Sequence, residues 1–144
     1  MVPPARLAPL ALVVALAAAG CGQSNKDSAT DFSGEQRAVA QTVEDLQSAG
    51  RKGDAQKICT DLLAPALIEE IRHASGDCAK TLDDALQDAD AFEMTVEKVT
   101  VNGPRATAVV KSDAGDKDRT DTLELIREGR NWKIASLGGA PAGS

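Results

Sequence analysis

Aromatic residues are scarce in this sequence. They make up 2% of the chain, with one Trp, two Phe and no Tyr. The core must therefore be assembled from Ala, Val, Leu and Ile, which limits stacking chemistry, and no tyrosine hydroxyl is available to a site. Histidine is equally rare, because His73 is the only one, so a nucleophilic triad or a histidine base would have to use it. His73 lies about 200° around a helix from the apolar Ile71, so we expect it at the surface.

The chain also lacks a glycine-rich phosphate loop and any run of basic residues. Neither GxGxxG nor GxxxxGK followed by Ser or Thr occurs. The net charge is −6, with 22 acidic residues against 16 Lys and Arg. This balance argues against nucleic acid as a partner and against electrostatic docking on anionic lipid.

An acidic run in the second half of the chain has the composition of a calcium loop but the wrong spacing. Counted from Asp116, the sixth position is Asp121 where such a loop needs Gly, and the twelfth is Arg127 where it needs Glu. The acidic residues between positions 83 and 90 indicate a solvated face. We therefore expect no metal site and no cofactor.

The amino-terminal segment has the parts of an export signal. Arg6 is followed by an apolar stretch over residues 7–19 and by small residues up to Gly20. The stretch is shorter than the roughly 20 residues that a transmembrane helix needs. The run LAAAGC, which ends at Cys21, resembles the lipidation box of bacterial lipoproteins, in which the cysteine is acylated and the chain is cut before it.

This resemblance implies a signal peptide over residues 1–20 and a lipid anchor on Cys21 that places the protein on the extracytoplasmic face of the cell membrane. Stable anchoring takes about two acyl chains, which a diacylglyceryl group would supply. A plain secretory signal with an incidental cysteine is the alternative. Removal of residues 1–20 leaves a length typical of one domain.

Two further cysteines, Cys59 and Cys78, form an even pair in an oxidising compartment once Cys21 carries lipid. We expect a disulfide between them. Closing a loop of about 20 residues stabilises a fold by roughly 3 kcal/mol in the chain-entropy model. A metal pair is the alternative, but neither a second His nor a CxxC spacing supports it.

Residues 21–32 are small and polar and predict a flexible tether ahead of the folded domain. Ser33 and Gln36 have the spacing of a capping box at the start of a helix. Apolar residues follow at helical spacing, and Gly50 predicts the end of this first helix. These apolar positions are Val39, Val43 and Leu46.

Three shorter helices are expected next. Asp54 can cap the second, Pro65 suits the first turn of the third, and Gly76 predicts its end. Asp77 can cap a fourth helix. The two cysteines then lie on neighbouring short helices, which a disulfide would hold together.

From Phe92 the hydrophobic period changes from 3.6 to 2. A slip in the alternation near Glu97 and Lys98 predicts a β-bulge, and Asn102-Gly103 predicts a hairpin turn. Further strands are expected over residues 105–111, 119–127 and 131–137. Residues 112–118 predict a polar connection, and residues 139–144 predict a disordered tail.

Helices followed by consecutive antiparallel strands predict an α+β fold with helices packed on one face of a curved sheet. Three local features are similar to those of a known superfamily. They are the Gly53-Asp54 pair between the first two helices, the cysteines within ICTDLL and GDCAKTL, and the closing hairpin LELIREGRNWKIASL. In this order they resemble the nuclear transport factor 2-like superfamily, a cone-shaped fold shared with ketosteroid isomerases and polyketide cyclases. The lipidation box makes the chain similar to small exported lipoproteins of high-GC Gram-positive bacteria. The expected domain covers residues 33–138.

Catalytic members of that superfamily use an Asp or His in the cone, often with a Tyr. Asp121 is the nearest candidate here, but its polar neighbours favour a solvated strand end. Trp132, Phe92 and Met94 are expected in the core, with the alternative that they line a ligand pocket. We name no catalytic residue.

The leading hypothesis is a lipid-anchored, extracytoplasmic binding module for a small apolar ligand or for an envelope protein. An isomerase- or dehydratase-like enzyme that uses a carboxylate is one alternative. A structural or sensing subunit of an envelope complex is another.

Overall fold

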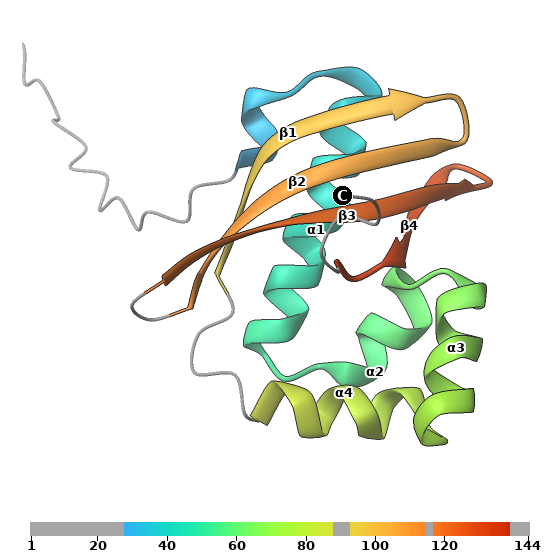
Figure 1. Ribbon diagram of the computed structural model, residues 1–144. Coiled ribbons are helices and arrows are strands. Elements are labelled where there is room, and N and C mark those ends of the chain that lie inside the picture. The colour runs from blue at the N-terminus through green and yellow to red at the C-terminus, as the bar shows by residue number, and fades with distance from the viewer. Residues whose placement is uncertain (1–27, 88–92, 115–116, 139–144) are drawn as a thin grey trace, which may run out of the picture.

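The structure is a computed structural model that describes residues 28–87, 93–114 and 117–138. The expected signal peptide 1–20, Cys21, Phe92 and the tail 139–144 lie outside these ranges. The described elements follow the predicted order, helices first and strands second (Figure 1). They are η1 (Ser28–Asp31), α1 (Gly34–Arg51), α2 (Ala55–Lys57), η2 (Ile58–Leu62), α3 (Pro65–Ser75), α4 (Cys78–Gln87), β1 (Met94–Asn102), β2 (Arg105–Ala114), β3 (Lys117–Glu128) and β4 (Asn131–Ser136).

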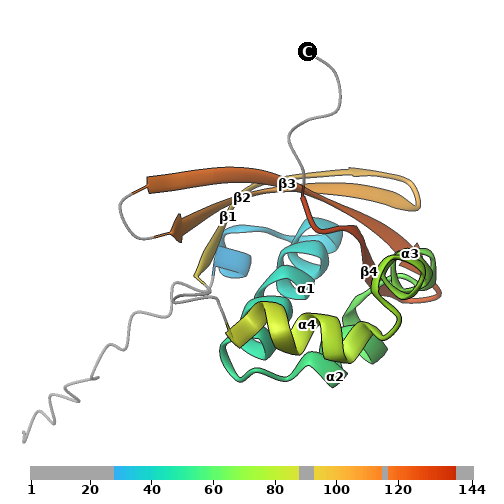
Figure 2. The same ribbon diagram turned by 60° about the horizontal axis from the view of Figure 1, so that its bottom comes forward.

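The four strands form one antiparallel sheet in the order β1-β2-β3-β4. Figure 2 shows this curved sheet as one layer, with α1 to α4 on one side of it. The predicted α+β class is therefore confirmed. The pairing of β1 with β2 shifts between Val96 and Lys98, which leaves Glu97 as the extra residue of the predicted bulge.

The hairpin of β2 and β3 is longer than expected. Ser112 pairs with Arg119 and Asp113 with Asp118, so most of the predicted polar connection 112–118 is strand. An ion pair of 2.7 Å between Lys111 and Asp118 joins the two strands. Cross-strand pairing of opposite charges stabilises a sheet, and the local polarity of these residues misled the sequence interpretation.

The core lies between α1 and the concave face of the sheet. The predicted apolar positions of α1 are buried, and Val39 has an exposed fraction of 0%. The facing strand residues are equally buried, with exposed fractions of 0% for Ala108 and 1% for Leu125. Side chains without accessible surface border neither solvent nor a void large enough for water. Among the described residues, aliphatic side chains are therefore packed closely at these positions between α1 and the sheet.

The start of α1 differs from the predicted capping box. Ser33 has the extended backbone of an N-cap, but its side chain makes no capping hydrogen bond. Gln36 Nε2 donates instead to the Val99 carbonyl on β1 at 3.0 Å. A bond to the sheet has replaced the local one, and Gly50 is buried inside a helix that continues to Arg51.

The packed domain begins earlier than the expected residue 33. Ser28 Oγ accepts a hydrogen bond from the Val96 N–H of β1 at 3.1 Å and lies within 3.4 Å of Glu44 Oε1 on α1. The Ala29 N–H donates to the same Glu44 oxygen at 2.6 Å. Ser28 is 5% exposed and Ala29 6%. The tether predicted over residues 21–32 is therefore wrong for its last residues, because η1 is ordered by bonds to distant elements.

The short helices begin and end where local signals predict. Asp54 Oδ1 accepts from the Lys57 N–H at 3.0 Å, Pro65 opens α3, and Gly76 follows α3 with φ of 93°. Asp77 Oδ1 accepts from the Lys80 N–H at 2.7 Å at the start of α4. Within the described ranges, the helices are each too short or too polar to cross a membrane.

An unexpected π-helix, η2, follows α2 directly and connects the helices to the sheet. After it, Leu63 forms a parallel bridge with Ile134, and the Ala64 N–H donates to the Ile134 carbonyl at 2.8 Å. The disulfide between Cys59 and Cys78 joins η2 to α4, with their Cα atoms 6.2 Å apart. Both cysteines are buried.

Candidate functional site

A groove of about 500 Å³ lies between α1, the α2–η2 segment and the turn that joins β3 to β4. Sequence segments far apart in the chain form its walls. The lining residues are Ala38, Gln41, Thr42 and Asp45 of α1, Lys57, Asp61 and Leu62 of α2 and η2, and Arg130, Asn131, Trp132 and Lys133 of the hairpin.

The α1 wall follows from helical geometry. Residues 38, 41, 42 and 45 have the spacing i, i+3, i+4 and i+7, which places them along one helix face. This face adjoins the buried face that packs on the sheet. On the other side, Gly129 adopts φ of 62° in the tight turn between β3 and β4 and is followed by Arg130. Glycine suits this conformation because a Cβ atom disfavours positive φ.

The groove carries charges of both signs and several polar side chains that have no partner. Within the described parts of the chain, the side chains of Gln41, Asp45, Lys57, Arg130 and Asn131 make no hydrogen bond or ion pair. These groups are therefore available to a bound molecule.

The remaining charged groups of the groove are partly engaged. Lys133 Nζ donates to the backbone carbonyl of Asp61, and the Asp61 carboxylate accepts from Thr60 Oγ1 at 3.0 Å. An ammonium group has three N–H donors, so Lys133 keeps donors for a ligand. The Asp61 carbonyl holds this ammonium at the edge of the groove.

Trp132 lines the groove, and its side chain is held in place by its neighbours. The residue is 4% exposed, and its indole Nε1 donates to Glu35 Oε2 at 2.9 Å. The guanidinium of Arg127 lies 5.0 Å from the ring centre and pairs with the same Glu35 oxygen at 2.9 Å. The sequence raised both a core role and a lining role for Trp132, and it is buried and also borders the groove.

The other predicted lining residues do not reach this groove. Met94 is half-buried at the start of β1 and packs against the core. Phe92 lies outside the described residues. His73 is exposed on α3, as expected from its position around the helix.

Asp121 shares a face of β3 with the buried Leu123 and Leu125, so it lies on the concave side of the sheet. Its side chain is 19% exposed, which corrects the expectation of a solvated strand end. Arg119 Nε lies 2.8 Å from one carboxylate oxygen and 2.9 Å from the other. The carboxylate is thus already engaged by a guanidinium.

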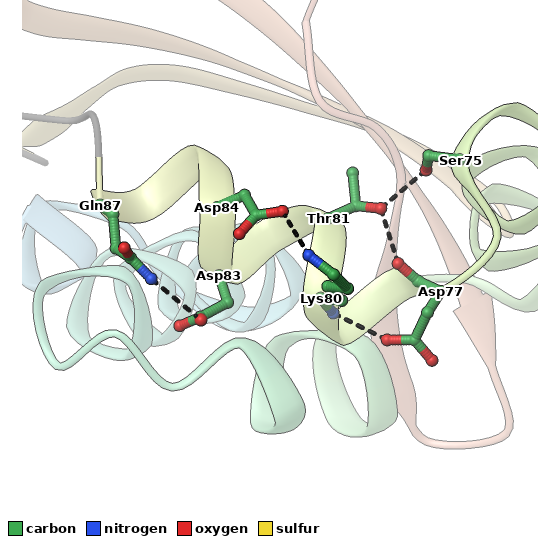
Figure 3. A network of polar contacts seen from close by, with 7 residues as sticks. All are labelled: Ser75, Asp77, Lys80, Thr81, Asp83, Asp84 and Gln87. Carbon is green, nitrogen blue, oxygen red and sulfur yellow. Dashed lines mark hydrogen bonds and ion pairs between the residues drawn. The ribbon is translucent and has the colours of Figure 1, made fainter.

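A separate polar network runs along α4 (Figure 3). Lys80 Nζ bonds to Asp84 at 2.9 Å, and Thr81 Oγ1 lies between the Asp77 carbonyl and Ser75 Oγ. The hydrogen bond and the charge of Asp84 raise the pKa of Lys80 above its usual 10.5. These contacts lie at the solvent surface. Among the described residues no group of three or more His, Cys, Asp or Glu is placed to hold a metal ion.

Most of the groove residues have no signature in the sequence. The α1 face could be found from its 38-41-42-45 spacing, but such a pattern is typical of any solvated helix face. Lys57, Arg130 and Lys133 come from separate elements, and only the packing of the hairpin beside η2 brings them together.

A search of the curated proteins finds no matching relative. Among solved structures, a de novo designed NTF2 fold protein is similar at 14% identity and a TM-score of 0.44, over 73% of this chain and 85% of the designed one. A protein-family model described as putative lumazine-binding matches residues 34–137, which include every described element from α1 to β4. This chain therefore belongs to the putative lumazine-binding family.

Proposed function

We propose that the protein is a lipid-anchored binding module on the outer face of the cell membrane that takes a small polar ligand in the groove beside α1. The observation that carries the proposal is the set of unpartnered polar side chains around a groove of about 500 Å³. Small-molecule sites typically measure about 300–1,000 Å³. The sequence favoured an apolar ligand, whereas the polar lining of this groove leads us to propose a polar one.

The family description supports a heteroaromatic ligand for the first test. Lumazine is a fused ring system whose edge carries carbonyl and N–H groups. The side-chain amides of Gln41 and Asn131 can each donate and accept hydrogen bonds, so they suit such an edge. Lys57 and Arg130 add N–H donors for the carbonyl groups.

The test uses the single tryptophan as a reporter. Because the chain has one Trp and no Tyr, fluorescence excited in the indole band reports on Trp132 alone. We expect lumazine to quench this fluorescence in a saturable manner in the full-length protein. Ala38→Leu, which adds three carbon atoms to the groove wall, should weaken the binding. Ala85→Leu is the matched control, because Ala85 is an exposed helical alanine on α4 and does not line the groove.

Together, the two variants show whether lumazine binds in the groove. Saturable quenching that Ala38→Leu weakens and Ala85→Leu leaves unchanged supports the groove as the site. The absence of saturable quenching in protein shown to be folded by circular dichroism would refute lumazine as a ligand of this groove. Equal weakening by both substitutions would mean that the ligand binds elsewhere.

The anchoring half of the proposal has its own support and its own test. The lipidation box around Cys21 and the disulfide between Cys59 and Cys78 both suit an exported protein. We expect Cys21→Ser to release the protein from the membrane fraction and to remove the mass of the acyl groups from the mature chain. A variant that stays with the membranes would contradict a lipid anchor on Cys21.

A role through an apolar partner surface has less support. Among the described residues the exposed large hydrophobic side chain is Leu137, at 40%. Interaction sites that depend on apolar contact present contiguous patches of several such residues. The groove therefore remains the better candidate for recognition.

A further inference from the structure

We infer that the groove binds an anionic group of its ligand, a carboxylate or a phosphate, through Lys57, Arg130 and Lys133. The inference rests on the proposed function for the location of the ligand and adds the charge that the ligand carries. It depends on three observations: the local charge, the pairing of cations elsewhere and the position of each cation.

The local charge of the groove is opposite to that of the whole chain. The full sequence has a net charge of −6. The groove holds three cationic side chains and two carboxylates, those of Asp45 and Asp61. Its lining is thus cationic within an acidic protein, and such a contrast attracts anions to one place on the surface.

Several cations outside the groove are paired with carboxylates. Arg72 pairs with Glu69 at 3.0 Å and Lys80 with Asp84 at 2.9 Å. Lys57 and Arg130 have no carboxylate partner among the described residues, although Asp45 lines the same groove. Cations without a carboxylate partner also occur outside the groove in the described parts of the chain, for example Lys52, Lys98 and Arg105. The distinguishing feature of Lys57 and Arg130 is therefore that both line the same groove.

The three cations have chemistry suited to carboxylate or phosphate. A guanidinium presents two parallel N–H groups to such an anion. Arg130 follows Gly129 in the tight turn between β3 and β4. Lys133 is oriented by the Asp61 carbonyl. Lys57 stands on the opposite element, at the last residue of α2. An anion between hairpin and helix would contact cations from both walls.

The experiment compares two probes in the full-length protein. Lumazine and lumazine-6-carboxylate are titrated while Trp132 fluorescence is followed, at a pH below the ionisation of the ring. We expect the carboxylate to bind more tightly, by about two- to five-fold for each exposed ion pair formed. Added salt should remove most of this difference, because exposed charges are screened.

Charge variants then test the residues. Arg130→Gln and Lys57→Gln should each weaken the carboxylate probe by about two- to five-fold more than they weaken neutral lumazine. Asp45→Asn should act in the opposite direction and strengthen the carboxylate probe. Lys98→Gln is the matched control, because this exposed lysine lies on β1, at the far edge of the sheet from β4.

The outcomes separate this inference from the proposed function. If both probes bind equally and the charge variants change nothing, the anion site is refuted while the ligand groove stands. If neither probe binds, inorganic phosphate is titrated and followed by NMR at the amides of Lys57 and Arg130. Saturable shifts there, lost in Arg130→Gln, would keep the anion site and reject the lumazine ring. The absence of such shifts would overturn the inference.

Discussion

Replacement of Ser28 by alanine tests the least expected feature of the fold, the docking of η1 on the domain. The Ser28 hydroxyl accepts the Val96 N–H across 68 residues of sequence and lies near Glu44. Ser28→Ala removes both contacts without adding bulk. The bond from the Ala29 N–H to Glu44 remains, so the variant isolates the hydroxyl.

The size of the effect follows from burial. Ser28 is 5% exposed and Val96 is also 5% exposed, so water cannot readily replace the lost acceptor. A buried donor without a partner costs about 1–3 kcal/mol. The distance of 3.4 Å to Glu44 makes that second contact weak. We therefore expect a loss of about 2 kcal/mol, which lowers the Tm of a domain of this size by roughly 10 °C.

Urea denaturation followed by Trp132 fluorescence measures this loss. The midpoint should fall while the m value stays constant, since the same surface is exposed on unfolding. Ser48→Ala is the control, because Ser48 is exposed on α1 and should change the free energy of unfolding by less than about 0.5 kcal/mol. If Ser28→Ala is no less stable than this control, η1 is not part of the folded domain.

Three further predictions concern the helices. The double variant Cys59→Ala/Cys78→Ala should lose about 3 kcal/mol in the same denaturation assay, because the disulfide closes a loop with a sequence separation of 19; a loss under about 1 kcal/mol would contradict this. Gly76→Ala should cost about 1–2 kcal/mol from backbone strain at φ of 93°, although the space around it is open, and a stabilised variant would refute the assigned conformation. Because Asp84 raises the pKa of Lys80 above 10.5, this pair stabilises the fold at neutral pH and the contribution is lost as pH rises through the raised pKa. Asp84→Asn should return the pKa of Lys80 toward 10.5 in a lysine NMR titration, and an unchanged value would exclude the pair in solution.

Structural features that depend on residues close together in the sequence were predicted correctly. Asp54 and Asp77 cap helices through bonds to N–H groups three residues ahead, so nothing distant has to be known. Pro65 and Gly76 bound α3 for equally local reasons. The bulge at Glu97 was visible because a slip in a period of two moves every later side chain to the other face.

Predictions failed where a distant group competed for the same atoms. Gln36 has the spacing of a capping box, yet it bonds to Val99, 63 residues away. Ser28 lies in a polar stretch that predicts a flexible tether, yet its hydroxyl accepts a hydrogen bond from the Val96 N–H and lies near Glu44. In both cases the side chain bonds to an element that is distant in the sequence, so the local pattern alone does not predict its partner.

The sequence by itself determined the class of the protein: the order of helices and strands, the disulfide partners and the aliphatic core all follow from residue type and spacing. Only the tertiary structure decided where a ligand can bind. The groove takes its cations from α2, the β3–β4 turn and β4, and its opposite wall from α1. No local pattern links these segments, because their proximity results from the packing of α1 and η2 against β4 and not from any property of the segments alone.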